Sequence, residues 1–433
     1  MKAISFDQLQ ETVYHEKLPN GLNVYLLPKP GFQKTYATFS THYGSIDNHF
    51  QVEGQNAAQV PDGIAHFLEH KMFEEPEGDI FAKFASLGAS ANAFTSFDRT
   101  VYLFSATNQI EQSLTTLIDF VQNPYFTDQN VEKEKGIIGQ EINMYGDNPD
   151  WRVYFGLIEA LYAKHPVRID IAGTVASISE ITKETLYLCY HAFYHPTNMS
   201  LFIVGGFEPE LIMELVRANQ AAKTFPPQGE IQRFFEEEPQ PVKQKEKRIE
   251  LPVSLPKCLF GFKDLVGQES GEQLLRKELT TKLALDALLS GSSNLYQSMY
   301  DDGIISDSFG HEFNCGVNYS FSIIGGDTKD PEALMARVSE ELKRATEHGI
   351  DAAAFERSKR KKIGAFLRMM NSPESLAHEF TKYEFKGTHL FDVLQVYESI
   401  THEEANRRIA EHVDFDRMAV CIVHSPEGEP AAL

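Results

Sequence analysis

A change in composition near residue 225 constrains the fold of this chain more than any other feature of its sequence. The segment FPPQGEIQRFFEEEPQPVKQKEKR contains four prolines and many charged residues and has little periodicity, as is typical of a linker. Before and after it the patterns follow one order: strands, a helix, further strands and then helices. The chain is therefore predicted to contain two structurally similar α+β halves, each a mostly antiparallel sheet covered by helices.

The expected domains are residues 1–226 and 248–433, joined by a linker at 227–247. A chain of 433 residues is too long for one ordinary core, and domains of about 200 residues are common. No window approaches about 18 consecutive apolar residues, and the segment MKAISFDQLQETVYHEK contains no apolar signal region. We therefore expect a cytoplasmic protein without membrane insertion.

Charge and cysteine content exclude some classes of protein. The formal net charge of -22 repels nucleic acid and attracts basic or neutral peptides, although solubility alone explains it equally well. The cysteines are far apart and form no C-x-x-C pair; they are Cys189, Cys258, Cys315 and Cys421. We expect reduced thiols rather than disulfides or a zinc ribbon.

The stretch GIAHFLEHKMFE, residues 63–74, is the strongest candidate for a metal site. In a helix with Asp62 as its N-cap, His66 and His70 lie one turn apart on one face, where two imidazoles can bind one Zn²⁺. Glu69 leans toward the same face and could touch a water on that metal. The pattern H-x-x-E-H is the reverse of H-E-x-x-H and is the inverzincin signature.

A second helix is expected to supply the remaining ligand. In VEKEKGIIGQEINMY, Glu134 and Glu141 are two turns apart on one face, and Ile137, Ile138 and Ile142 would seat the helix in the core. Carboxylates directed inward from an apolar helix need a partner, because a buried unpaired charge is costly. A metal ion would be such a partner for either glutamate.

These stretches, together with GASANAFTSFDRTVYLF and YHPTNMSLFIVGGFEPE, resemble in their order the motifs of the pitrilysin / mitochondrial processing peptidase family of zinc peptidases. The resemblance covers most of residues 10–215 and is looser in the second half, which lacks the metal motif. It implies one Zn²⁺ per chain held by His66, His70 and Glu141. It further implies that Glu69 is the general base and that Glu134 orients the site.

The family fold implies two halves that close like a clam shell around a chamber. The resemblance also implies that an extended peptide adds as a strand beside the metal, along the backbone of Ala91, Asn92, Ala93 and Phe94. Without the upstream motif, an ordinary strand would be the better interpretation of this segment.

The second half departs from the family pattern. Many members carry an arginine–tyrosine pair there, but NLYQSMYDDGIISDSFGHEF contains no convincing pair, and Tyr300 stands about where the arginine would be. Two-subunit members of the family divide the zinc site and this pair between two chains. We therefore expect a heterodimer with a paralogous chain, or failing that a homodimer.

Two functions from different classes are compatible with the sequence. The first is a zinc endopeptidase that hydrolyses short or unfolded peptides, and the second is a non-catalytic scaffold or assembly subunit of the same fold. The presence of all the metal-site residues favours the enzyme. His165 and His195 are interpreted as structural, and the basic run ERSKRKKIG as a solvated helix face rather than a site for acidic peptides or a partner.

Overall fold

The computed structural model describes residues 1–76, 78–267 and 269–426. The chain forms two compact units, each built from both halves of the sequence. Unit 1 comprises Met1–Ile142, Ile169–Phe235 and Met369–Phe385, and unit 2 comprises Asn143–Arg168, Glu236–Arg368 and the described residues from Lys386 on. The predicted α+β class with two similar halves is confirmed. The domain boundaries at 226 and 248, and a chamber between the halves, stay predictions.

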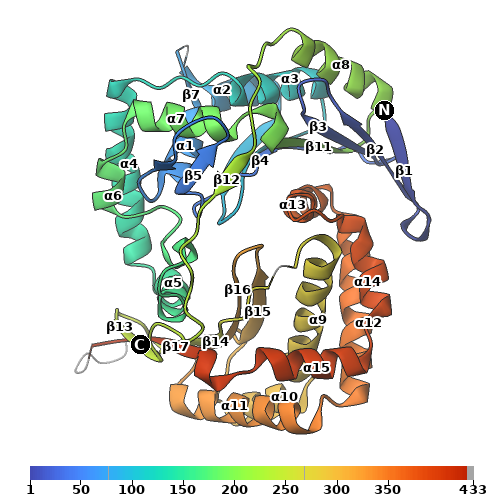
Figure 1. The fold of residues 1–433 in the computed structure, drawn as a ribbon. Helices are drawn as coiled ribbons and strands as arrows, with labels where there is room; N and C mark the ends of the chain where they lie inside the picture. The colour runs from blue at the N-terminus through green and yellow to red at the C-terminus, as the bar shows by residue number, and fades with distance from the viewer. Residues whose placement is uncertain (77, 268, 427–433) are drawn as a thin grey trace. The chain divides into compact units, whose positions relative to one another are not determined.

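Unit 1 contains a seven-stranded sheet in the order β1-β2-β3-β11-β4-β10-β9. Figure 1 labels β1, β2, β3, β11 and β4 of this sheet. Neighbouring strands are antiparallel except β3 and β11, which pair in parallel. The edge strand β9 pairs with β10 from Ser90↔Ser105 to Thr95↔Thr100. The strands are β1 (Lys2–Phe6), β2 (Glu11–Lys17), β3 (Asn23–Pro28), β4 (Thr35–Thr41), β9 (Ser90–Thr95), β10 (Thr100–Ala106) and β11 (Met199–Gly205).

One face of this sheet packs against a layer of helices. Phe67 and Leu68 of α1, Phe104 of β10 and Leu117 of α3 belong to the core between them and have no exposed surface. Each such side chain contributes about 1.5–3 kcal/mol of burial free energy. The helices are α1 (Ile64–Met72), α2 (Ile80–Ser86), α3 (Ile110–Val121), α4 (Asp128–Gly146), α6 (Val175–Ser179), α7 (Lys183–Phe193) and α8 (Pro209–Ala221).

The opposite face of the sheet is covered by α13 (Pro373–Glu384), a helix from the second half of the sequence (Figure 1). Phe380 of α13 stacks on Phe202 of β11 with ring centroids 4.1 Å apart and lies 4.9 Å from Tyr25 of β3. At the end of α13, the hydroxyl of Tyr25 donates to Glu384 over 3.3 Å. Burial raises the pKa of this carboxyl to about 7.

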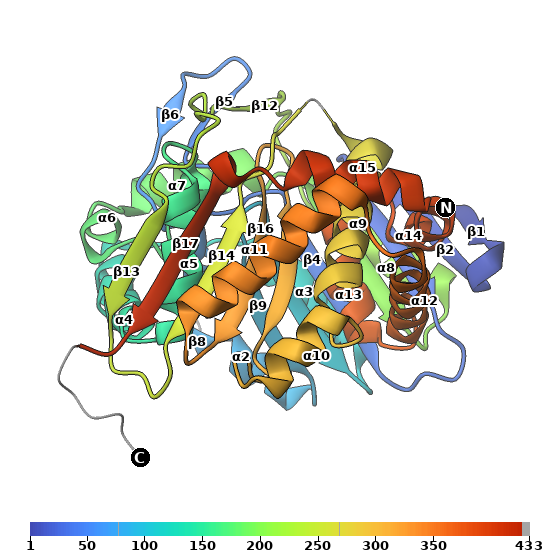
Figure 2. The ribbon, with the colours of Figure 1, turned by 90° about the horizontal axis from the view of Figure 1, so that it is seen from below.

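Unit 2 contains a five-stranded sheet in the order β13-β17-β14-β16-β15, and Figure 2 shows β13 beside β17. The strands are β13 (Glu246–Glu250), β14 (Lys257–Phe262), β15 (Gly310–Cys315), β16 (Ser320–Asp327) and β17 (Met418–His424). The main helices are α9 (Gly271–Leu289), α10 (Asn294–Asp301), α11 (Pro331–His348), α12 (Ala352–Met369), α14 (Val393–Ser399) and α15 (His402–His412). A further helix from the first half of the sequence, α5 (Pro149–Leu161), packs on β14 and β17.

The two units repeat one plan. The order β13-β17-β14-β16-β15 matches β3-β11-β4-β10-β9, and the first pair is parallel in each sheet. In chain order α9 corresponds to α1, α12 to α4, and α13 to α5. The corresponding helices α5 and α13 are exchanged, because each packs on the sheet formed by the other half of the sequence.

The predicted linker is anchored in both units. In unit 1, β12 (Ile231–Arg233) pairs with β5 (His49–Val52), which pairs with β6 (Ala58–Gln59), and Arg233 forms an ion pair with buried Asp47 over 2.7 Å. In unit 2, the carboxylate of Glu238 accepts hydrogen bonds from three consecutive backbone amides, those of residues 163–165. The segment is therefore ordered on both sides despite its prolines and charges.

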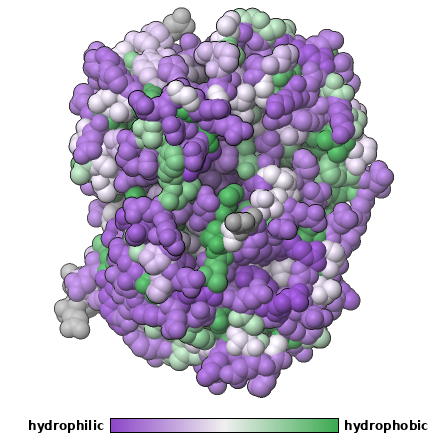
Figure 3. Space-filling model, in the orientation of Figure 1, coloured by the Kyte–Doolittle hydropathy of each residue, from purple (hydrophilic) through white to green (hydrophobic). Residues whose placement is uncertain are grey.

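The surface in Figure 3 is mainly hydrophilic, with hydrophobic residues in small groups, as expected from the net charge of -22. All four cysteines are buried and free, which confirms the prediction of thiols. Across the described part of the chain, no helix combines the length and the apolar character needed to span a membrane.

Glu384→Gln tests the docking of α13. The folded state raises the carboxyl pKa from 4.5 to about 7, so it binds the proton more tightly than the unfolded chain does. Stability from this group is therefore present below pH 4.5 and is lost as the pH rises toward 7. The amide cannot ionise, so between pH 4 and pH 8 the variant should gain up to about 3 kcal/mol of unfolding free energy relative to wild type. Chemical denaturation across this range measures the difference.

The matched control is Glu374→Gln, which removes an exposed carboxylate from the same helix. A difference between Glu384→Gln and wild type that stays constant from pH 4 to pH 8 would contradict the account.

Candidate metal centre

The helix that carries the two histidines, α1, begins at a glycine. Gly63 is the N-cap with φ of 88°, and a Cβ at this position would lie 2.4 Å from the carbonyl oxygen of Ala172. The prediction of Asp62 as N-cap is therefore wrong, because the close approach of Ala172 requires glycine at the helix start. The carboxylate of Asp62 instead accepts a hydrogen bond from Asn48.

The apolar positions of α1 fix the direction of its histidines. Phe67 and Leu68 enter the core, so His66 and His70 lie together on another face, with ring centroids 4.5 Å apart. Both side chains are partly exposed, by 12% and 27%. Burial and the neighbouring His70 lower the pKa of His66 to about 4. Its imidazole is therefore neutral at neutral pH, the form that binds metals.

Helix α4 brings Glu141 to this pair. Oε1 of Glu141 lies 3.8 Å from Nε2 of His66, and Oε2 of Glu141 lies 3.6 Å from Nε2 of His70. One ligand atom from each of the three residues can be chosen so that all lie within 4.8 Å of one another. Ligands around a tetrahedral zinc with bonds of about 2.0–2.1 Å are roughly 3.3 Å apart, so small rotations of the side chains would suffice.

Glu134 approaches His70 from the opposite side. Its Oε1 lies 3.1 Å from Nδ1 of His70, and its Oε2 lies 3.6 Å from Nζ of Lys71, a lysine with no exposed surface. Burial would raise the pKa of Glu134, but His70 and Lys71 lower it further than that, so the carboxylate is ionised. This arrangement fixes the His70 ring with Nε2 toward Glu141 and resembles the carboxylate–histidine pairs of metal sites.

Glu69 lies on α1 between the two histidines in sequence and is 7% exposed. Its Oε2 accepts a hydrogen bond of 2.8 Å from the hydroxyl of Thr95 at the end of β9. Burial raises the pKa of this carboxyl above its ordinary value, while Thr95 opposes that shift. Burial would lower the pKa of His70, but Glu134 and Glu69 raise it.

The residues present fit a divalent cation. Glu141 lies beside both imidazoles, Glu134 contacts His70, and Glu69 interacts electrostatically with His70 and Glu141. Partly buried negative charge of this kind is costly unless a cation shares it. The donor set of two imidazole nitrogens and one carboxylate oxygen is one that catalytic zinc takes. In the described ranges, His66, His70 and Glu141 are the grouping able to hold an ion.

For one residue of α4, Ile137, the prediction of a core position is wrong. Ile138 is fully buried and Ile142 packs against the core, but Ile137 is 45% exposed. Ile137 and Ile138 lie on opposite flanks of Glu134, about 100° apart around the helix, so the core can take only one of them.

The segment predicted to pair with substrate is the edge strand β9. Ala91 and Ala93 pack against the core, while Phe94 points to the other face, where its ring lies 5.3 Å from that of His378 on α13. Asn92 lies between the two alanines and alternates with them. Peptide addition at this edge stays a prediction.

The remaining residues singled out in the sequence have structural contacts. Nδ1 of buried His165 accepts from the amide of Val167, and His195 caps the turn at Pro196–Asn198. Tyr300 lies on α10 and is stacked on Tyr296. These contacts agree with structural roles for the two histidines.

The prediction that the basic run ERSKRKKIG is a solvated helix face is wrong for two of its lysines. Lys361 and Lys362 of α12 lie 2.9 and 3.2 Å from the buried carboxylate of Asp286 on α9, and His311 of β15 is 3.7 Å from it. These elements correspond to α4, α1 and β9 of unit 1. Lysine side chains thus supply the cations at the place in unit 2 that corresponds to the metal centre.

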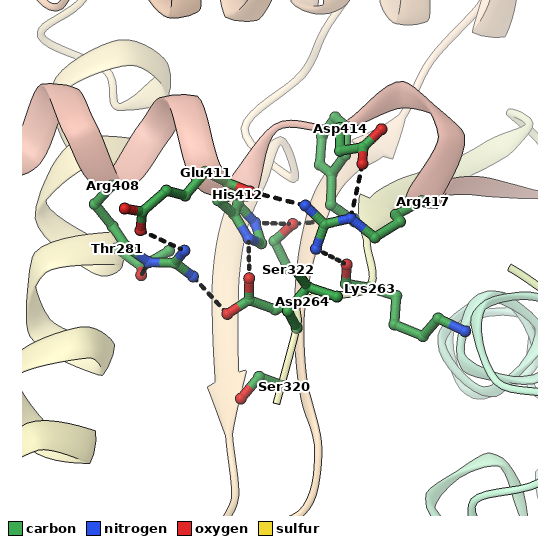
Figure 4. A network of polar contacts seen from close by, with 12 residues as sticks. Lys263, Asp264, Thr281, Ser320, Ser322, Arg408, Glu411, His412, Asp414 and Arg417 are labelled. Carbon is green, nitrogen blue, oxygen red and sulfur yellow. Dashed lines mark hydrogen bonds and ion pairs between the residues drawn. The ribbon is translucent and has the colours of Figure 1, made fainter. Parts of the chain in front are cut away.

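A second polar constellation lies in unit 2 (Figure 4). Asp264 lies 3.4 Å from Nδ1 of His412, and Nε2 of His412 lies 2.8 Å from the hydroxyl of Ser322. This order resembles a catalytic triad, but Ser322 and His412 have no exposed surface, so no substrate could reach the hydroxyl. Arg408 also donates to Asp264, and the network connects α15 to the sheet.

The H-x-x-E-H order on one helix, with the third group on another, is the arrangement of inverzincin metal sites. The family described as insulinase (peptidase family M16) matches residues 56–175, and the M16 inactive domain matches residues 180–362. The uncharacterized zinc protease YmfH of Bacillus subtilis (strain 168) is 55% identical over 424 residues, covering 98% of this chain and 99% of that protein. The chain belongs to peptidase family M16.

Solved structures agree with this assignment. The crystal structure of a protein described as an M16-like peptidase, from Alicyclobacillus acidocaldarius, has a TM-score of 0.94 and 43% identity, covering 96% of this chain and 99% of that chain. A peptidase M16 inactive domain from Pseudomonas fluorescens has a TM-score of 0.78 at 16% identity, covering 96% and 99%. The second likeness shows the fold alone.

Gly63→Ala is expected to destabilise the protein through α1. An alanine at positive φ costs about 1 kcal/mol, and the contact with Ala172 adds roughly 1–3 kcal/mol. Gly54→Ala is the control, because Gly54 has φ of 81° but nothing within 4 Å of its added Cβ. Denaturant unfolding should show the larger loss for Gly63→Ala, and equal losses would refute a steric role for Ala172.

Glu141→Gln is expected to lower zinc affinity more than Glu134→Gln does. The first removes a direct ligand, whereas the second removes a hydrogen-bonding partner of His70, which typically costs about 10–100-fold. Competition with a chromophoric chelator measures both affinities. A stronger effect of Glu134→Gln would contradict this assignment and indicate that Glu134, and not Glu141, is the direct ligand.

Proposed function

We propose that this chain is a zinc endopeptidase that hydrolyses short or unfolded peptides, with His66, His70 and Glu141 as ligands of one zinc ion per chain. The observation that carries the proposal is the grouping of His66, His70 and Glu141, with the carboxylate of Glu69 close enough to interact electrostatically with His70 and Glu141. A buried carboxylate beside two metal-binding imidazoles, directed by a hydrogen bond, is what a general base for hydrolysis requires.

Each residue has a distinct part in the proposed reaction. Zinc bound at this position would polarise the scissile carbonyl and make a water acidic enough to attack at neutral pH. Glu69 takes the proton from the attacking water and delivers it to the leaving amine nitrogen. Glu134 keeps the His70 ring in one orientation, and Lys71 lies between Glu134 and Glu74 and shares its positive charge with both.

The edge strand β9 is proposed to hold the peptide. Backbone groups of Ala91, Asn92, Ala93 and Phe94 on the unpaired side of the strand would bond the peptide main chain, beside α1. Recognition through the main chain makes cleavage less dependent on substrate side chains. The negative charge of the chain favours basic or neutral peptides over acidic ones.

We propose that a second, paralogous subunit completes the site, with a homodimer as the alternative. This rests on the sequence of α10, where Tyr300 stands in place of the arginine of the family pair. A cytoplasmic location remains part of the proposal. A scaffold role without catalysis is the competing function, and the retained His66, Glu69, His70 and Glu141 are the evidence against it.

The direct test is cleavage of a quenched peptide library by the purified chain with bound zinc, alone and with proteins recovered with it from the native cell. Cleavage that a chelator abolishes and added zinc restores would support the enzyme. A protein without bound zinc or cleavage, in both preparations, would support the scaffold. Full activity of the monomer would refute the need for a partner.

Glu69→Gln separates the base from the metal site. The amide keeps the shape of the side chain but cannot accept the proton of the water, so hydrolysis should fall by about 10²–10⁴-fold with zinc content unchanged. Zinc analysis and peptide hydrolysis are measured on the same sample. Full activity in this variant would reject Glu69 as the base.

A further inference from the structure

Thr95 contacts Glu69 from the strand proposed to bind the peptide. Its hydroxyl lies 2.8 Å from Oε2 of Glu69, and Thr95 is the last residue of β9, paired with Thr100 of β10. Along β9 the side chains alternate between the two faces of the sheet. Thr95 therefore shares a face with Ala91 and Ala93, which pack against the core that includes α1.

The surroundings of Thr95 define the direction of its hydrogen bond. The small side chains of Ala91 and Ala93 let α1 lie close to the strand, within reach of a short hydroxyl. Thr100, 3.4 Å from the Thr95 hydroxyl, donates its own proton to the carbonyl of Tyr43. An ionised Glu69 can only accept, so Thr95 must be the donor. Its β-branched side chain also has few alternative rotamers in a strand.

We propose that Thr95 is a positioning residue for the general base. By holding Oε2, its hydroxyl leaves Oε1 of Glu69 directed at the attacking water. Because Thr95 lies on β9, the same strand sets both the register of the peptide and the orientation of the base. This inference rests on the proposed function and extends it to a residue outside the metal-binding helices.

The alternative is that Thr95 merely satisfies a buried carboxylate. In that case its loss would lower the stability of the fold or the retention of zinc. A positioning role instead predicts a loss in kcat with little change in KM, because only the step that moves the proton depends on the orientation of Glu69.

Thr95→Val, Thr95→Ser and Ser96→Ala make a matched set. Valine keeps the branched shape without the hydroxyl, and serine keeps the hydroxyl. Ser96→Ala removes a neighbouring hydroxyl that contacts Asp98 and the carbonyl of Arg99 instead of Glu69. We expect Thr95→Val to lose roughly 10–100-fold in kcat, as for a hydrogen bond to a charged group. Thr95→Ser and Ser96→Ala should stay within about threefold of wild type, with zinc content and Tm of all three variants unchanged.

A readout independent of turnover is the affinity of the zinc-loaded protein for a phosphinic peptide, which mimics the tetrahedral state that Glu69 contacts. Calorimetry should show that Thr95→Val binds the phosphinic peptide more weakly than wild type, by about the factor lost in kcat. The amide peptide of the same sequence is measured in the Glu69→Gln background, where it is not cleaved. There, adding Thr95→Val should leave its affinity unchanged. Wild-type kcat in Thr95→Val, or loss of zinc or Tm in that variant, would overturn the inference while leaving the proposed function intact. A zinc-loaded wild type that neither cleaves peptides nor binds the phosphinic peptide would overturn the proposed function, and this inference with it.

Discussion

The convergence of three carboxylates beside two imidazoles is the constraint on which the rest of unit 1 depends. Glu69 comes from α1 and Glu134 and Glu141 from α4, and their negative charges would repel one another if nothing else were present. Lys71, which has no exposed surface, offsets the charge of Glu134 in part, because it also pairs with Glu74. A divalent cation bound by His66, His70 and Glu141 would offset the others, and this is the basis of the proposed metal centre.

The scaffold around this centre controls its geometry through close packing. Gly63 lets α1 approach Ala172, and the core residues of α1 then determine which face carries the histidines. Glu134 fixes the ring of His70, and Thr95 holds Glu69 from the neighbouring strand. Each contact acts on a different ligand or base, so loss of any one would disturb the site in a distinguishable way.

Local periodicity made much of this structure predictable. The i, i+4 spacing of His66 and His70 and the two-turn spacing of Glu134 and Glu141 predict which side chains share a face of a helix. Periodicity shows which face of a helix is apolar but not which sheet that face covers, so the exchange of α5 and α13 could not be foreseen. The contacts of Lys71 with Glu134 and of Thr95 with Glu69 were missed for a related reason, because each joins two elements that are far apart in the sequence.

The repeat gives the metal centre an internal comparison. In unit 2 the corresponding elements hold Asp286 with Lys361 and Lys362, so the buried carboxylate there is neutralised by the chain itself. We propose that unit 1 uses a zinc ion instead. Zinc K-edge absorption of the purified protein tests this most directly. It should show one zinc per chain with two imidazole nitrogens and carboxylate or water oxygens at about 2.0–2.2 Å. Sulfur ligands, or protein that binds no zinc when the metal is supplied, would contradict it.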